Sequence, residues 1–376
     1  MRISTQQLLR FDRWLVGLHR WIVRFPTDVS PDVDHGQFLV IKLAGMGSII
    51  RFLSQCEEHR IDRSAFTLVT FSRHREVCDW MGVENCQYIR SDSLWHFLRD
   101  CWAVRACVRQ RRPAWIIDLE RCSNAVSLFR HWLAQAGGCR TLSFGTLERP
   151  STSFHEYHDA NLFSFHQIIN RALEILPLQD SGYSSPQPVE RDPQKVIVNI
   201  NSSDYVLARR YPIHLFQALI TELHQSRPGL TFYFTGSPQE ANYVNQLVQS
   251  LTTMHIAAHG VAGEWTIQDL AAELSTASLF ITGDSGPLHL AVHLHTPTMA
   301  IWGPTQPGQF GYEKKEAMIN VTLSLSCSPC FHHPQSRVAA FCAGRISCLA
   351  DLQPSSIVRH ALLLMGFSPA HAAETS

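Results

Sequence analysis

The segment SLFITGDSGPLHLAVHLHTPTMAIWGPT, residues 278–305, contains the pattern that decides the fold. Its first five residues form an apolar run typical of a buried strand, and residues 298–302 form a second such run. Between them, apolar residues recur at helical spacing over residues 288–295, and the expected buried stripe comprises Leu288, Ala291, Val292 and His295. A strand, a helix and a second strand in this order indicate a parallel α/β sheet.

The turn between the first strand and the helix carries chemistry suited to an anion. Asp284 falls where the strand ends, and Pro287 suits the first turn of the helix, with Ser285 or Gly286 before it as the cap. Free backbone amides at a helix start attract anions, and His289 is expected to add a donor from an exposed first turn. The segment therefore indicates a phosphate-binding turn. An ordinary capped turn with a surface histidine is the alternative, and the spacing alone does not separate the two.

The same alternation of strands and helices extends along most of the chain. Further strands are expected at residues 38–41, 66–70, 115–117, 196–200 and 230–234, and further helices from residue 49 and at residues 216–223 and 266–275. Residues 181–194 hold three prolines and show no periodicity, which is typical of a linker. We therefore predict two doubly wound domains whose strands end at a shared cleft, where ligands bind in such folds.

The predicted domain organisation has five parts. They are a lead-in with an amphipathic helix (1–36), a first Rossmann-like domain (37–182), a linker (183–194), a second Rossmann-like domain (195–350) and a C-terminal helix with a tail (351–376).

Composition limits the function classes. The chain has 376 residues, with 32 Lys and Arg against 32 Asp and Glu, so it lacks the basic excess typical of nucleic-acid binding. No apolar run is long enough to span a bilayer, and Asp12 and Arg13 interrupt the first apolar stretch, so we expect neither a membrane span nor a signal peptide. The eleven cysteines are then expected to be reduced, in a cytoplasmic protein.

Residues 6–25 form an amphipathic pattern with one basic face, on which Arg10, Arg13, Arg20 and Arg24 lie. Such a helix either attaches to an anionic membrane surface, which would make the protein peripheral on the inner membrane, or packs on the core of its own chain. The pattern does not decide between these.

The segment ITGDSGPLHLAVHLHTPTMAIWGPT closely resembles the signature of glycosyltransferase family 9, the bacterial heptosyltransferase family. FLVIKLAGMGSII, VIVNINSSDYVLARRYPIHLF and FYFTGSPQEANYV resemble other family segments in the same order, so the resemblance covers most of residues 37–350. It implies the GT-B fold, with two facing Rossmann-like domains and a cleft between them. It also implies an inverting transfer, without a catalytic metal, from a nucleotide sugar that is typically ADP-heptose.

Site residues follow from the resemblance position by position. The donor diphosphate site is expected at Asp284, Ser285, Gly286, Pro287 and His289, and small hydroxyl residues at Ser202 and Ser203 are expected to contact phosphate. Either Arg209 or Arg210 matches a basic residue near the same oxygens, and Gly236 with Glu240 matches the loop that holds the nucleoside. Amide dipoles and a guanidinium there would stabilise the charge on the leaving diphosphate.

The general base is less clear from the family pattern. Many members carry an aspartate after the first glycine turn, but here Gly45 and Gly47 are followed by Ser48, which is a poor base. Glu120 is the preferred candidate and Asp118 the second, because both follow the expected strand at residues 115–117. The alternative for Asp118 is a cap on the next helix.

Four cysteines cluster late in the chain, at Cys327, Cys330, Cys342 and Cys348. A Cys-x2-Cys turn with two further thiolates predicts a closed, structural metal site, with zinc as the chemical default. Related autotransporter heptosyltransferases carry iron on four cysteines. Unligated thiols are the alternative.

The leading hypothesis is therefore transfer of heptose, or a related sugar, to a cell-envelope glycan or glycolipid such as lipopolysaccharide core. A protein acceptor, as in autotransporter heptosylation, is the second hypothesis. A non-catalytic scaffold that binds nucleotide sugars is the third, because Ser48 replaces the usual aspartate.

Overall fold

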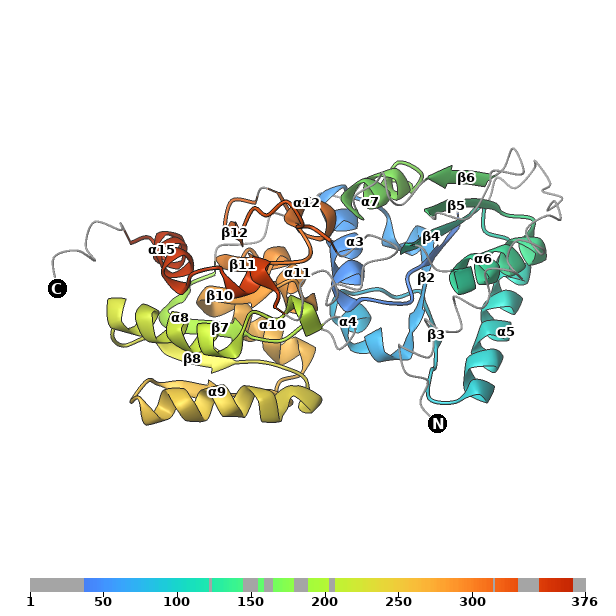
Figure 1. The fold of residues 1–376 in the computed structure, drawn as a ribbon. Coiled ribbons are helices and arrows are strands. Elements are labelled where there is room, and N and C mark those ends of the chain that lie inside the picture. The colour runs from blue at the N-terminus through green and yellow to red at the C-terminus, as the bar shows by residue number, and fades with distance from the viewer. Residues whose placement is uncertain are drawn as a thin grey trace. The chain divides into compact units, whose positions relative to one another are not determined.

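The structure is a computed structural model, and it describes most of the chain in two compact units, Met1–Ser184 and Ser185–Ser376 (Figure 1). The described residues are 37–121, 124–144, 155–158, 165–178, 189–202, 207–313, 315–330 and 345–367. The expected helix at residues 6–25 lies outside this part of the chain. Each unit is described below by itself.

The first unit is built on a six-stranded parallel sheet in the order β3-β2-β1-β4-β5-β6. Its strands are β1 (Phe38–Ile41), β2 (Phe66–Phe71), β3 (Cys86–Ile89), β4 (Trp115–Arg121), β5 (Arg140–Phe144) and β6 (His155–His158). This is the strand order of a doubly wound, Rossmann-like domain. The order reverses between β1 and β4, which pair directly.

Helices cover both faces of this sheet (Figure 1). One face carries α3 (Met46–Glu58), α4 (Arg75–Trp80) and α7 (Phe165–Leu173), and the other carries α5 (Leu94–Arg111) and α6 (Asn124–Gly137). Buried side chains of α5 and α6, including Val104, Val108 and Leu133, pack with Leu39 and Ile116 of the sheet in one apolar cluster. Burial of this apolar surface is the main stabilising contribution to the unit.

The second unit repeats the same strand order with a second parallel sheet, β12-β11-β10-β7-β8-β9. Its strands are β7 (Asp192–Asn199), β8 (Thr231–Phe234), β9 (Ala258–Gly260), β10 (Ala277–Gly283), β11 (Thr298–Trp302) and β12 (Met318–Thr322). Here the order reverses between β7 and β10.

The helices of the second unit are α8 (Ile213–Ser226), α9 (Ala241–Thr253), α10 (Ile267–Thr276), α11 (Gly286–His293), α12 (Pro307–Phe310), α14 (Ser347–Ala350) and α15 (Pro354–Leu364). Thr266 caps α10 through its side chain, which accepts a hydrogen bond from the backbone N–H of Asp269. None of the helices in the described residues combines the length and the apolar character that a bilayer-spanning segment needs.

The predicted α/β fold class is confirmed, and the expected strands at residues 38–41 and 298–302 have the predicted bounds. Three local expectations are wrong. Residues 118–121 continue β4, so the two candidate carboxylates lie within the strand. β7 begins at Asp192, inside the expected linker, because Asp192 already pairs with Ala277. His295 is exposed, because α11 ends before it and its φ of 55° turns the chain away from the helix.

Candidate active site

In each unit, the candidate residues gather where the strand order reverses. Asp118 and Glu120 of β4 lie beside the end of β1, since Ile41 and Asp118 are paired. Asp284 directly follows β10, whose partner β7 ends at Asn199. The carboxyl ends of strands at such a reversal point are the usual ligand-binding edge of an open α/β sheet. The two sites are described in turn.

A buried hydroxyl network shapes the turn before α11. The Asn199 side-chain amide donates to Ser285 Oγ at 2.9 Å and to Thr282 Oγ1 at 3.2 Å, and the two hydroxyl oxygens are 2.9 Å apart. Ser285 occupies the N-cap position of α11, but its side chain makes no capping hydrogen bond. The network therefore fixes the conformation of the turn. Because the Ser285 side chain does not cap the helix, the backbone N–H groups at the start of α11 can donate to another acceptor.

Asp284 is paired with a cation from a distant part of the chain. Arg209 Nη1 donates to Asp284 Oδ2 at 2.9 Å, and the two side chains are 14% and 7% exposed. A carboxylate repels a phosphate oxygen, so Asp284 is suited to holding the guanidinium of Arg209 beside the start of α11. Of the two arginines that the sequence left open, Arg209 is the one that contacts the Asp284 turn.

The neighbouring Arg210 pairs with a different carboxylate, that of Glu240. Its guanidinium donates to Glu240 Oε1 at 3.2 Å and lies over the Tyr243 ring, 4.8 Å from the ring centre. The other carboxylate oxygen, Glu240 Oε2, accepts from the backbone N–H and the hydroxyl of Ser237, at 2.9 Å each. The structure thus shows Glu240 closing a capping box and bound to a guanidinium. Its contact with a nucleoside stays a prediction.

Gly236 and Ser202 are two further candidate residues, each in a segment that follows a strand of the second sheet. A Cβ on Gly236 would come 2.6 Å from Asn201 Nδ2, so the close approach of the loop to the end of β7 requires glycine. Ser202 is buried at 3% exposure, at the same strand end. Ser203 lies outside the described residues.

His289 differs from the sequence expectation, because it is buried at 6% exposure. Its Nδ1 lies 3.2 Å from the Tyr312 hydroxyl, and the two rings are tilted with centres 5.5 Å apart. No pattern in the sequence indicated this contact between His289 of α11 and Tyr312. The histidine is therefore part of the packing of the site.

In the first unit, Glu120 is held by two donors from the end of β1. Lys42 Nζ donates to Glu120 Oε2 at 2.9 Å, and the backbone N–H of Ala44 donates to Oε1 at 2.7 Å. Lys42 and Glu120 have side chains only 6% and 11% exposed. An ammonium and a backbone amide, one on each oxygen, therefore fix the orientation of the carboxylate.

Asp118 is placed more deeply, at 3% exposure. Its Oδ1 accepts the backbone N–H of Glu120 at 2.9 Å, and its Oδ2 lies 3.5 Å from Arg130 Nε of α6. The pairing of β4 with β5 shifts register between Ile117 and Arg121, which marks a local irregularity at these residues. Asp118 therefore shapes the strand around Glu120 and binds Arg130.

The glycine turn after β1 begins α3. Gly45, at a φ of 83°, is the N-cap of that helix, a backbone conformation that favours glycine. Gly47 is buried and Ser48 half-buried in the first turn, where the backbone N–H of Ser48 donates to the Gly45 carbonyl at 3.0 Å. No contact joins Ser48 to either carboxylate among those described.

Three of the four late cysteines are described, and they differ in environment. Cys327 is exposed, Cys330 is half-buried, and Cys348 is 4% exposed within the apolar core of the second unit. Cys342 lies outside the described residues. Within the part of the chain that is described, no three His, Cys, Asp or Glu side chains group as a metal site would require. The four-thiolate site stays a prediction, which elemental analysis of the purified chain decides.

Lys42, Asn199, Arg130 and Tyr312 are the site residues that sequence reasoning missed. A signal existed for two of them. Lys42 directly follows a wholly apolar run, and Asn199 interrupts one, so each places a polar group at the ligand-binding end of a buried strand. Arg130 and Tyr312 give no comparable local signal.

Comparison with known proteins shows which proteins this chain is similar to. The family model described as glycosyltransferase family 9 (heptosyltransferase) matches residues 171–339. Lipooligosaccharide heptosyltransferase 2 of Campylobacter jejuni is 28% identical over 179 residues, which is 46% of this chain and 51% of that protein. Lipopolysaccharide heptosyltransferase 3 of Escherichia coli is 34% identical over 92 residues, or 24% and 26% of the two chains. In the first of these alignments the chain spans about half the length of its relative.

Solved structures of the class share the fold over both units. The E. coli ADP-heptose lps heptosyltransferase II structure has a TM-score of 0.62 at 16% identity and covers 88% of this chain and 98% of its own. A glycosyl transferase family 9 structure from Veillonella parvula has a TM-score of 0.64 at 18% identity, with 89% and 98% covered. Residues 171–339 thus match glycosyltransferase family 9, the family that the sequence motifs resemble, and both units share the fold of these solved structures.

Replacing His289 with alanine is expected to lower stability, in keeping with its burial. Loss of the hydrogen bond and ring contact to Tyr312 should reduce the free energy of unfolding by roughly 1–3 kcal/mol. His214→Ala, at an exposed position in the first turn of α8, is the matched control and should change it by less than about 0.5 kcal/mol. Chemical denaturation compares the variants, and equal stability of His289→Ala and wild type would contradict the packing role.

A second prediction concerns His74, which is buried beside the first-unit site with Nδ1 3.0 Å from Thr70 Oγ1. Burial, with smaller contributions from the charges of Arg73 and Lys42, lowers the pKa of His74 to about 3. In the unfolded chain His74 gains a proton near pH 6.5, whereas in the folded protein it stays neutral until about pH 3. The free energy of unfolding should therefore fall as the pH falls from about 6.5 toward 3, by up to about 1.4 kcal/mol per pH unit.

Denaturation of the His74→Gln variant across this pH range tests the assignment. The variant should lose that part of the pH dependence, whereas His59→Gln, at an exposed position, should retain it. An unchanged slope in His74→Gln would show that the acid sensitivity has another source.

Proposed function

We propose that this chain is an inverting glycosyltransferase that moves heptose from an ADP-linked donor to a glycan of lipopolysaccharide or lipooligosaccharide core. The observation that carries the proposal is the Asp284 turn, where Arg209 and the start of α11 converge at the ligand-binding edge of the second sheet. The family match and the relatives, which are heptosyltransferases of these glycans, support the acceptor, and the fold shared with the ADP-heptose lps heptosyltransferase II supports the donor.

The second unit supplies the leaving-group chemistry. As the acceptor hydroxyl oxygen attacks the anomeric carbon, the bond between that carbon and the diphosphate oxygen breaks, and ADP leaves with the electron pair. The backbone N–H groups at the start of α11 and the guanidinium of Arg209 would stabilise the negative charge that develops on the diphosphate. Asp284 fixes the guanidinium in advance, which lowers the reorganisation needed during the reaction.

The first unit supplies the proton acceptor. Glu120 is favoured as the general base, because its contacts with Lys42 and Ala44 fix its orientation and each of its oxygens retains a further lone pair. Asp118 is less suited, since both its oxygens face the protein: one accepts from the backbone and the other faces Arg130. We assign Lys42 and Asp118 as residues that position Glu120.

The variant Glu120→Gln tests this assignment, because glutamine keeps the shape of the side chain but cannot accept the proton. The transfer rate, measured as ADP release from ADP-heptose with a truncated lipooligosaccharide acceptor, should fall by about 100-fold or more. Binding of ADP should be unchanged. Glu84→Gln, an exposed position in the same unit, is the control and should have the wild-type rate.

Two results would contradict the proposal in different ways. A transfer rate within a few-fold of wild type in Glu120→Gln would remove Glu120 from the mechanism but leave the activity. Wild-type protein that binds ADP-heptose without transferring the sugar would instead favour the non-catalytic scaffold.

A further inference from the structure

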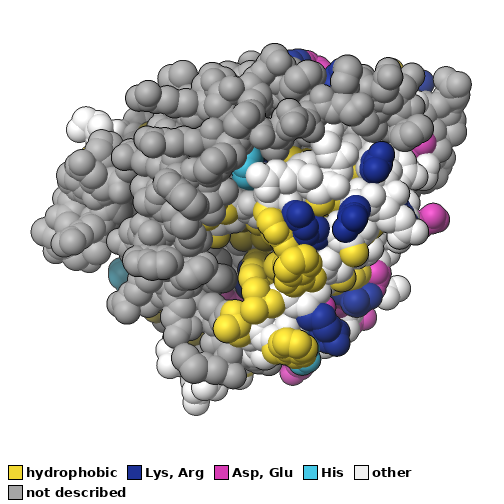
Figure 2. All heavy atoms as spheres, turned by 90° about the vertical axis from the view of Figure 1, so that its right-hand side faces the viewer, with side chains coloured by type: hydrophobic (Ala, Val, Ile, Leu, Met, Phe, Trp, Pro, Cys, Tyr) yellow, Lys and Arg dark blue, Asp and Glu magenta, His cyan; other side chains and the backbone are white. Residues whose placement is uncertain are grey.

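One helix of the first unit exposes an unusual amount of apolar surface. Leu94, Trp95, Leu98 and Trp102 of α5, here called the α5 tryptophan face, are 63%, 73%, 46% and 61% exposed. The other large exposed apolar side chains of the described residues occur singly on separate segments. Figure 2 views the side on which Figure 1 draws α5, and shows hydrophobic side chains gathered into one area with Lys and Arg beside it.

This face lies beside the side of α5 that packs on its own domain. Cys101, Val104 and Val108 project from that neighbouring side of the helix and pack into the core cluster of the first unit. Within the face, Trp102 contacts the Trp132 ring of α6 yet stays 61% exposed, and Leu94 and Trp95 are at least as exposed. Contiguous exposed apolar surface of this kind marks an interaction site.

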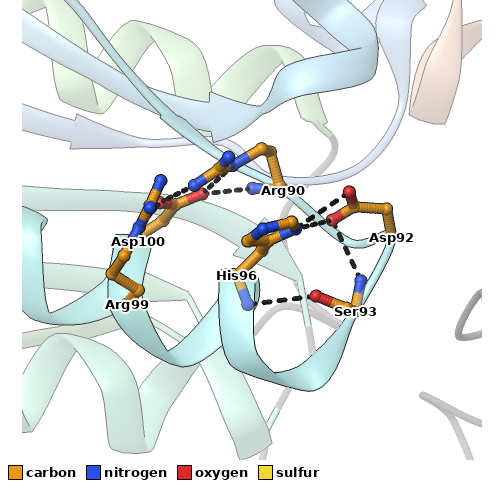
Figure 3. Close-up of polar contacts among 6 residues, drawn as sticks. All are labelled: Arg90, Asp92, Ser93, His96, Arg99 and Asp100. Atoms are coloured by element: carbon orange, nitrogen blue, oxygen red, sulfur yellow. Dashed lines mark hydrogen bonds and ion pairs between the residues drawn. The ribbon is translucent and has the colours of Figure 1, made fainter.

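Polar contacts fix the start of α5, so the face is presented in a defined orientation (Figure 3). Arg90, at the end of β3, donates to both carboxylate oxygens of Asp100, with Nε and Nη2 distances of 2.8 and 2.7 Å. This contact lowers the pKa of Asp100 to about 2, chiefly through the hydrogen bond from Arg90. Ser93 caps the helix by accepting from the backbone N–H of His96, whose ring contacts Asp92.

The charges around the face have one predominant sign. Besides Asp100, whose charge is compensated by Arg90, α5 has no acidic residue, whereas it carries Arg99, Arg105, Arg109 and Arg111. At 3.6 residues per turn, Arg105 and Arg109 continue the stripe formed by Leu94, Leu98 and Trp102 toward the end of the helix. Arg99 and Arg109 are exposed. The face is thus apolar in its first half and cationic in its second.

We infer that the α5 tryptophan face docks the first unit on an anionic lipid bilayer. Tryptophan favours the headgroup region of a bilayer, where its ring is partly desolvated and its N–H stays hydrogen-bonded. Arginines on the same stripe attract anionic headgroups, and a helix with this combination lies in the plane of the interface. The inference goes beyond the proposed transfer activity and does not depend on it.

The full chain is tested by flotation with phosphatidylcholine vesicles, with and without phosphatidylglycerol. Wild type should float with the anionic vesicles and bind the neutral ones at least about tenfold more weakly. Leu94→Ser/Trp95→Ser should lose anionic binding by about tenfold or more without disturbing the contact of Trp102 with Trp132, whose ring centres are 5.0 Å apart. Arg99→Gln/Arg109→Gln should lose the preference for anionic lipid.

Leu98→Ser and Leu363→Ser form a matched pair, because the two leucines are 46% and 45% exposed on helices of different units. The first variant should weaken flotation and the second should not. Thermal unfolding and ADP binding should match wild type in all variants, since the substituted side chains lie on the surface and none of them belongs to the Asp284 turn.

Three outcomes would overturn the inference: wild type does not float with anionic vesicles, or Leu94→Ser/Trp95→Ser floats as well as wild type, or Leu98→Ser and Leu363→Ser reduce flotation equally. Light scattering completes the test. If wild type self-associates but does not bind vesicles, and Leu94→Ser/Trp95→Ser abolishes the self-association, the face instead binds a second copy of the chain.

Discussion

Parallel pairing of the first and fourth strands is the constraint on which both candidate sites depend. In the second unit, β7 and β10 pair from Ala277 to Thr282, which brings the ends of two strands 83 residues apart to one edge. In the first unit, pairing of β1 with β4 does the same for Lys42 and Glu120, which are 78 residues apart. Because the strand order reverses at these pairs, the chain leaves in opposite directions and the edge between them stays accessible.

Both sites contain a mostly buried ion pair, but the charges have opposite roles in the two units. In the second unit an acid, Asp284, holds the guanidinium of Arg209, which we propose binds the diphosphate. In the first unit a lysine, Lys42, holds an acid that suits the acceptor proton. Each functional group is thus paired with an opposite charge that is mostly buried, which fixes its orientation before substrate binds.

Sequence patterns predicted the strands well where both faces of a strand are buried, because the apolar run then ends where burial ends. They failed for β4, since Asp118 and Glu120 looked like the end of the strand although they continue it in an irregular form. They also failed for His289, because its burial depends on Tyr312, which lies 23 residues later. The choice between Arg209 and Arg210 likewise required the tertiary structure, since neighbouring side chains diverge to Asp284 and Glu240.

Arg209, held by Asp284, is proposed to bind the diphosphate of the donor, and calorimetric titration with ADP tests this contact most directly. Arg209→Gln should weaken ADP binding by about tenfold or more, as expected for a charge-assisted contact with phosphate. Arg359→Gln, at an exposed position on α15, should bind ADP like wild type. Folded Arg209→Gln protein with ADP affinity within about twofold of wild type, a difference below 0.5 kcal/mol, would contradict the account.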